Sequence, residues 1–130
     1  MTRMMTFLIA AVLTTGPVQA KPGLRDVPEL DQGLFVIALA NEIRRKCDDI
    51  SPRWLRANSY VNDLQDKALS LGYTRAEVKA HLDDDAEKDR MRGLAARYMT
   101  DKGVANGDFC GLGRIEIAAG TDIGRLLRER

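Results

Sequence analysis

The chain has 130 residues, with 20 lysines and arginines against 19 aspartates and glutamates and a single histidine. This length suits one domain with a single core of modest size. A net charge of +1 gives no general attraction to nucleic acid or to an anionic membrane, which excludes proteins that bind these partners through their overall charge.

Residues 1–20 predict a secretory signal peptide. Arg3 supplies the positive start, residues 7–13 form a short apolar run, and Val18 and Ala20 place small residues before the cleavage site. The run is far shorter than the roughly 20 residues of a membrane span. We therefore expect a periplasmic mature chain that begins at Lys21 and lacks a transmembrane segment. A retained membrane anchor is the weaker alternative, because no stop-transfer segment follows.

Without residues 1–20 the chain keeps 19 basic and 19 acidic side chains, so we expect no nucleic-acid partner. Two cysteines remain, Cys47 and Cys110, and export places them in an oxidising compartment. Two thiols allow one intramolecular pairing, which predicts a Cys47–Cys110 disulfide. A reactive pair or two buried free thiols are the weaker alternatives, because reactive pairs usually lie closer in sequence.

Residues 21–30 contain Pro22, Gly23 and Pro28, which disfavour regular structure. We therefore expect an extended N-terminal arm there, followed by a single helical domain over residues 31–130. Asp31 is the expected cap of the first helix. The helix should bury one face, formed by Val36, Leu39, Ala40, Ile43 and Cys47.

The most regular pattern lies between Ser51 and Gly72. Apolar residues recur there at spacings of three and four, which places them on one face of an α-helix. Ser51 and Pro52 are typical of a helix start and Gly72 of a helix end. The face consists of Trp54, Ala57, Val61, Leu64, Ala68 and Leu71. We expect Trp54 to lie in the core.

Two further helices have clear start signals. Thr74 and Glu77 have the spacing of a capping box, which predicts a short helix that ends near residue 82. Asp84 and Glu87 repeat this spacing and predict a longer helix that ends near residue 102. The apolar face of the longer helix consists of Met91, Leu94, Ala95, Tyr98 and Met99.

Asp108 is the expected cap of a fifth helix, which carries Phe109, Cys110, Leu112 and Ile115. Glycines at positions 111 and 113 each weaken an isolated helix by about 1 kcal/mol, and a closely packed neighbour would explain them. Residues 120–122 end this helix and begin a short terminal segment. No β-alternation is visible, so the predicted fold class is all-α: a compact bundle of five to six short helices with one disulfide.

Five carboxylates lie between Asp83 and Asp89, which makes this segment the first candidate for a metal site. It lacks the glycine and the distal glutamate of a calcium-binding loop. We therefore interpret it as a solvated helix start, with a specific ion site as the weaker alternative. His81 is the only histidine, which excludes a two-histidine metal site within one chain. We interpret it as a partly exposed structural residue.

No set of residues is typical of catalysis. Glu42, Glu77 and Glu116 are scattered along the chain, no serine lies in a nucleophile motif, and both cysteines are expected in the disulfide. We therefore expect neither an enzyme nor a bound cofactor or metal. A candidate docking edge for an acidic protein partner consists of Arg114, Arg125, Arg128 and Arg130, although a solvated surface is the favoured interpretation.

Five segments resemble those of a small exported alphaproteobacterial family, domain of unknown function 5333. They lie at residues 24–28, 50–53, 85–92, 110–117 and 123–128 and include Cys110. The resemblance extends over nearly the whole mature chain and brings no catalytic residues. It implies a gene position beside respiratory NADH dehydrogenase, and hence an accessory or assembly role at that enzyme.

Two functional hypotheses follow. The first is a non-catalytic periplasmic protein that is an interaction or accessory subunit of an envelope assembly, with respiratory NADH dehydrogenase as the implied protein partner. The second is a periplasmic stress holdase or inhibitor, since small helical proteins with a disulfide are common outside the cytoplasm. A small enzyme or ion binder is a third and weaker hypothesis that rests on the acidic segment alone.

Overall fold

A computed structural model describes Gly16 and residues 21–130, so the predicted signal peptide lies outside the described residues apart from Gly16. The helices are α1 (Pro28–Lys46), α2 (Trp54–Ser70), α3 (Arg75–Asp83), α4 (Asp85–Asp101), α5 (Phe109–Ala119) and α6 (Asp122–Arg125). A 3-10 helix, η1 (Leu24–Asp26), precedes α1, and strands β1 (Ile50–Pro52) and β2 (Leu127–Glu129) pair with each other. The all-α prediction is confirmed, with this small sheet added. None of the described helices combines the length and apolar composition that crossing a membrane requires.

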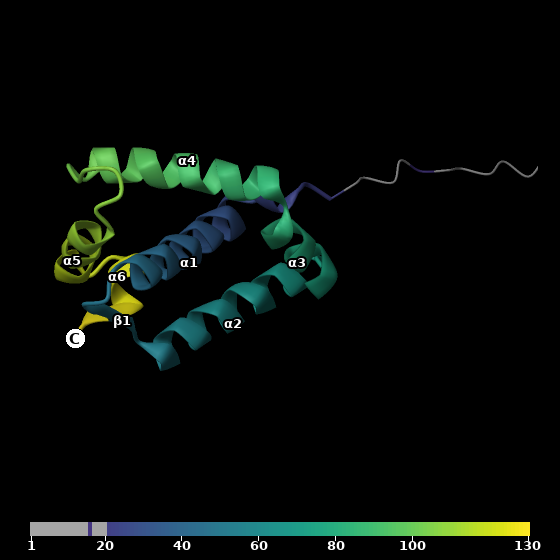
Figure 1. Ribbon diagram of the computed structural model, residues 1–130. Coiled ribbons are helices and arrows are strands. Elements are labelled where there is room, and N and C mark those ends of the chain that lie inside the picture. The colour runs from purple at the N-terminus through teal and green to yellow at the C-terminus, as the bar shows by residue number, and fades with distance from the viewer. Residues whose placement is uncertain (1–15, 17–20) are drawn as a thin grey trace, which may run out of the picture.

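Helix α1 lies at the centre of the fold, between α2 and α4 (Figure 1). Its predicted face is confirmed as buried: Val36, Leu39, Ala40, Ile43 and Cys47 are each at most 7% exposed. Other apolar residues of this helix, including Leu30, Leu34 and Phe35, are buried as well. A helix that is apolar on several sides needs neighbours on several sides, and this requirement arranges the remaining elements.

Residues 21–30 do not form the extended arm that the prolines suggested. They contain η1 and the first turn of α1, because Pro28 occupies the first helical position, where its missing N–H costs no hydrogen bond. Val27 precedes the helix, so Asp31 lies inside the first turn instead of capping it. A second, smaller core joins this segment to the end of α2 and consists of Leu24, Leu30, Ala68 and Tyr73.

The predicted helix start at Ser51 and Pro52 is wrong, because both residues belong to β1. Ser51 pairs with Arg128, and Pro52 pairs with Leu127, in an antiparallel ladder. Proline is tolerated here, since both strands of a two-stranded sheet are edge strands. Helix α2 begins only at Trp54, and no side chain caps its N-terminus.

Helix α2 has the predicted apolar face, but only part of this face is covered. Leu64 contacts α1 so closely that a Cβ added at Gly33 would lie 2.5 Å from it. Ala68 is buried, whereas Val61 is 42% exposed and Trp54 is 61% exposed. The expectation that Trp54 lies in the core is therefore wrong, because the ring lies beside Arg44 near the end of α1 and is not covered by the core.

The remaining helix starts are confirmed. Thr74 and Glu77 form a complete capping box on α3. Asp84, Asp108 and Thr121 each accept a hydrogen bond from a backbone N–H in the first turn of α4, α5 and α6, respectively. These caps satisfy donors that have no partner within the helix itself.

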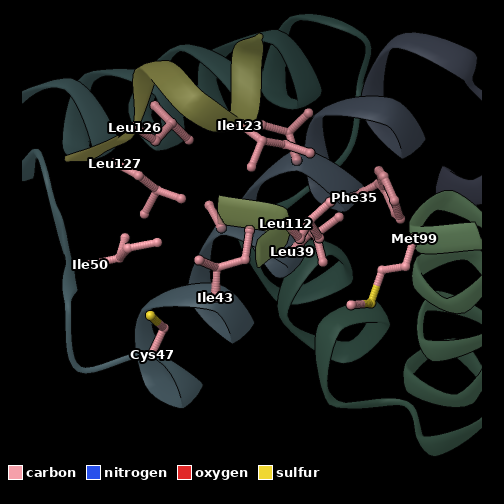
Figure 2. Packing of buried hydrophobic residues seen from close by; sticks show 12 residues of the cluster. Phe35, Leu39, Ile43, Cys47, Ile50, Met99, Leu112, Ile123, Leu126 and Leu127 are labelled. Carbon is pink, nitrogen blue, oxygen red and sulfur yellow. The ribbon is translucent and has the colours of Figure 1, made fainter. Parts of the chain in front are cut away.

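The main core lies where α1, α5, α6 and the sheet meet (Figure 2). Ile43, Leu112 and Leu127, from α1, α5 and β2, are each at most 1% exposed. The predicted disulfide is confirmed at this core: Cys47, directly after α1, is bonded to Cys110 of α5, and their Cα atoms are 5.2 Å apart. The bond spans a sequence separation of 63, and α2, α3 and α4 lie within the loop that it closes.

Two glycines permit close contacts around this core. A Cβ at Gly113 would lie 2.3 Å from the Ile50 side chain, and a Cβ at Gly124 would lie 1.9 Å from the backbone oxygen of Glu116. A side chain at Gly113 would therefore displace core side chains, and a side chain at Gly124 would displace the backbone of α5. The expectation that a close neighbour explains glycine in the fifth helix is confirmed at Gly113.

Removing the disulfide should destabilise this fold strongly. Closing a loop with a separation of 63 restricts the unfolded chain, an effect of about 4 kcal/mol in the chain-entropy treatment. We expect the Cys47→Ser/Cys110→Ser variant to lose roughly this free energy of unfolding in urea titrations followed by circular dichroism. A reducing agent should lower the free energy of unfolding of the wild type by a similar amount and leave that of the variant unchanged. Equal stability of the two proteins would contradict the expectation.

Candidate functional site

A groove of about 620 Å³ runs between α1 and α4. Its floor is apolar and is built from both helices by Leu34, Phe35, Ala38, Leu39, Met91, Ala95, Ala96 and Met99. Positions on each helix are separated mainly by three or four residues, so one face of α1 is turned toward one face of α4. Phe109 of α5 and Leu82 of α3 complete the lining.

The groove is open because the apolar face of α4 is only partly covered. Of the predicted face, Met99 alone is fully buried, at 1% exposed. Met91 and Ala95 pack against the edge of the main core and stay partly accessible. The two helices are joined beside the groove by Phe35 and Tyr98, whose rings meet edge to face with centroids 5.5 Å apart.

Charged side chains stand around the apolar floor. The cations are Arg45 and Lys46 from α1 and Lys88 and Arg92 from α4. The two carboxylates in the lining, Glu42 and Glu87, each form ion pairs with cations of this chain. The groove lining itself therefore holds four cations against two carboxylates, and each of these cations also pairs with a carboxylate of this chain.

His81 of α3 contributes a buried polar atom to the groove lining. Its side chain is 14% exposed, and its Nε2 atom has no hydrogen-bond partner within the described part of the chain. Oε2 of Glu87 lies 3.6 Å from this nitrogen, which is too far for a hydrogen bond. A buried nitrogen without a partner is costly, and this atom is closed to solvent in the same way as the Glu116 carboxylate.

An ion-pair network fixes the start of α1 to the start of α4. Arg90 donates two hydrogen bonds to Asp31, of 2.5 and 3.2 Å, and one of 2.9 Å to Glu87. The hydrogen bond with Asp31 and the further contact with Glu87 hold the pKa of Arg90 above its ordinary value. The side chains of Arg90 and Asp31 are each 22% exposed, so water screens this pair less than a surface ion pair.

A second polar cluster holds the C-terminal half of α4. Glu116 of α5 is fully buried, and the hydroxyl of Tyr98 lies 2.9 Å from both of its carboxylate oxygens. Thr121 donates another hydrogen bond to this carboxylate, and Nζ of Lys102 is 3.6 Å from it. The combination has the residue types of an acid-base site, but Glu116 has no exposed surface that a substrate could reach. We interpret it as a structural link between α4, α5 and α6.

The acidic segment 83–89 lies where α3 meets α4, and its carboxylates have local roles. Asp84 caps α4, Asp83 is 2.6 Å from Lys79, and Asp89 pairs with Arg92. Among the described residues, no group of three or more histidine, cysteine, aspartate or glutamate side chains has an arrangement that could hold a metal ion.

Two of the four arginines predicted as a docking edge are engaged in ion pairs. Arg114 lies 3.5 Å from Asp49, and Arg125 lies 3.9 Å from the aspartate three residues before it. Arg128 and Arg130 instead line a shallow depression beside the sheet, next to the start of α2. Of the four predicted arginines, only Arg128 and Arg130 therefore lie close together and close to α2.

The groove is not predicted by the patterns in the sequence. Helical periodicity shows which face of a helix is apolar, but it does not show how completely a neighbour covers that face. One signal was available: residues 34–40 of α1 are uniformly apolar, and the predicted apolar face of α4 is broad. Together these two surfaces exceed what a direct contact between two helices covers.

Comparison with known proteins supplies a family but no activity. The model of a family described as "Family of unknown function (DUF5333)" matches residues 22–128. No curated protein and no solved structure gives a significant match.

The buried cluster around Glu116 predicts an unusual titration. Burial, with smaller effects of the Glu116 hydrogen bond and charge, raises the pKa of Tyr98 to about 12 from an ordinary 10.0. The folded state therefore retains this proton more strongly than the unfolded state, so the stabilising contribution is complete below pH 10.0 and is lost as the pH rises toward 12. Phenolate absorbance should show this late titration.

Glu116→Gln should lower the pKa of Tyr98, because it removes the negative charge while conserving the volume of the side chain. Tyr98→Phe identifies the signal, since the late phase should disappear from its absorbance titration. A late phase that persists in Tyr98→Phe, or that is unchanged in Glu116→Gln, would show that the assignment to this pair is wrong.

Proposed function

The chain belongs to the DUF5333 family of unknown function, and on that premise we propose that it is an exported, non-catalytic accessory protein that binds a partner protein in the groove between α1 and α4. The observation that carries the proposal is the groove itself, whose apolar floor is accessible and whose lining includes four cations; the Glu116 carboxylate, by contrast, is closed to substrates.

The shape of the groove suits an α-helix. Its lining on α1 extends from Leu34 to Lys46, which corresponds to about 18 Å, or three helical turns. Helices bind in such grooves by burying apolar residues spaced three and four positions apart. Met91 and Met99 lie in the floor, and flexible methionine side chains adapt to partner side chains of different shape.

The charges around the groove define the chemistry of the partner. Arg45, Lys46, Lys88 and Arg92 would attract a helix whose apolar stripe is flanked by aspartate or glutamate. We therefore propose an acidic amphipathic helix as the occupant.

The disulfide supports the proposed location. A disulfide that links α1 to α5 persists in an oxidising compartment, which agrees with the signal peptide predicted over residues 1–20. In this proposal the partner is an envelope protein. Respiratory NADH dehydrogenase is the candidate implied by the family resemblance, through segments of that enzyme that face the periplasm.

Groove variants test the proposal by their pattern of binding. Ala95→Glu puts a carboxylate into the apolar floor, and Lys88→Glu/Arg92→Glu reverses the charge on one side. We expect both variants to lose at least about tenfold in affinity for the partner that the wild type captures from detergent-solubilised envelope membranes, which is about 1.4 kcal/mol. Titration of the purified partner gives the affinities.

Gly93→Glu is the matched control, because it adds the same charge to α4 at a position outside the groove lining, where a Cβ meets open space. It should bind like the wild type. Circular dichroism of each variant shows whether it is folded, and the double charge reversal touches only surface side chains. If the partner binds all variants equally, or if no captured protein distinguishes Ala95→Glu from Gly93→Glu, the proposal is wrong.

Export can be tested separately by intact-mass spectrometry. The protein recovered from the periplasm should have the mass of residues 21–130 with both thiols oxidised. Cleavage at that position follows from the small residues at the end of the predicted signal peptide. A full-length mass in the cytoplasmic fraction would contradict both the location and the source of the oxidation.

A further inference from the structure

The start of α2 carries the most exposed large apolar side chains of the described chain. Leu55 is 88% exposed and Trp54 is 61% exposed, although both are at the beginning of an amphipathic helix. Adjacent exposed tryptophan and leucine side chains are costly in water and mark surfaces that meet another phase or molecule. This place is distinct from the groove, because neither residue lines it.

Arginines surround this apolar pair. Arg56 is the next residue of the helix and is exposed. Arg44 of α1 lies over the Trp54 ring, with 5.8 Å between the guanidinium carbon and the ring centroid. Arg128 and Arg130 line the shallow depression that Trp54 borders. We call the set Arg44, Trp54, Leu55, Arg56, Arg128 and Arg130 the Trp54 tip.

Negative charge near the Trp54 tip is limited. Asp48 and Glu129 also line the depression, and Glu129 lies 3.5 Å from Arg114. The first turn of α2 contains no acidic residue, and its unpaired backbone N–H groups add partial positive charge. The strongly acidic segment 83–89 lies beyond the opposite end of α2 (Figure 1), which is about 25 Å long.

We propose that the Trp54 tip binds the surface of an anionic lipid bilayer. Tryptophan is favoured at the interface between headgroups and acyl chains, and leucine gains by entering the apolar region below. The arginines would then lie at the level of the lipid phosphates, where each contributes attraction that depends on the negative surface charge. The near-neutral net charge does not oppose this binding. Salt screens the charges of the acidic segment, so their repulsion from the bilayer does not reach the Trp54 tip.

The bilayer is favoured over a protein partner at this tip by its composition. Leu55 is 88% exposed and has no flat apolar face beside it, because the next residue of the helix is the exposed Arg56. A projecting apolar pair with cations around it suits a soft surface into which it can insert.

Trp54 reports on the proposal directly, because it is the only tryptophan of the chain. With vesicles of phosphatidylcholine and phosphatidylglycerol, we expect its emission to shift to shorter wavelengths and the oxidised protein to sediment with the vesicles. Vesicles of phosphatidylcholine alone should bind on the order of tenfold more weakly, and salt should weaken binding to the anionic vesicles.

Variants at exposed positions keep the test independent of folding. Leu55→Asp and Arg56→Glu should each reduce the partition constant for anionic vesicles by about tenfold or more. Arg97→Glu, an equal change of charge on an exposed position of α4, should stay within about twofold of the wild type.

Three results would overturn the proposal: no emission shift with anionic vesicles, equal binding of neutral and anionic vesicles, or equal losses in Arg56→Glu and Arg97→Glu. A self-association that Leu55→Asp abolishes, without vesicle binding by the wild type, would also overturn it and would assign the tip to a second copy of the chain. The vesicles contain no protein, so failure here leaves the groove variants unaffected.

Discussion

The structure depends on the burial of α1, which is apolar on more than one side. A short chain has little material to cover such a helix, because small domains bury a smaller fraction of their surface than large ones. The C-terminal half of α1 receives the main core from α5, α6 and the sheet, closed by the disulfide. Its other sides are left to α2 and α4, which cover them only in part. The groove and the exposed start of α2 are the two consequences.

Polar contacts fix the position of α4 beside the groove. Arg90 and Asp31 join the second turn of α4 to the first turn of α1, and Tyr98 and Glu116 fix the second half of α4 to α5. Both clusters are partly or fully buried, and each holds α4 through hydrogen bonds to one specific residue of a neighbouring helix. Apolar contacts such as that of Phe35 with Tyr98 also join α4 to α1. Both halves of α4 are thus held in place, and the apolar floor between the two helices stays accessible.

Local signals in the sequence predicted local structure well. Thr74, Asp84, Asp108 and Thr121 begin helices because a cap needs only the residues that follow it within one turn. Ser51 is also a typical capping residue, but the helix start predicted there is wrong. Its backbone pairs instead with that of Arg128, which lies far along the chain. The disulfide was predictable since two cysteines leave one choice. The groove was not, because its width depends on contacts such as Arg90 with Asp31 that no periodic pattern contains.

The balanced net charge conceals a separation of charge along the molecule. Carboxylates gather where α3 meets α4, while Arg44, Arg56, Arg128 and Arg130 surround Trp54 at the other end of α2. Most carboxylates where α3 meets α4 pair with lysine or arginine side chains, so the attraction of the arginines at the Trp54 tip decides the orientation near an anionic surface, with the tip toward it. Lys46 ends α1 a few residues before β1, so the groove end at Lys46 and Phe109 would be nearer the surface than the end at His81. An acidic helix close to a membrane would then meet the basic end of the groove first.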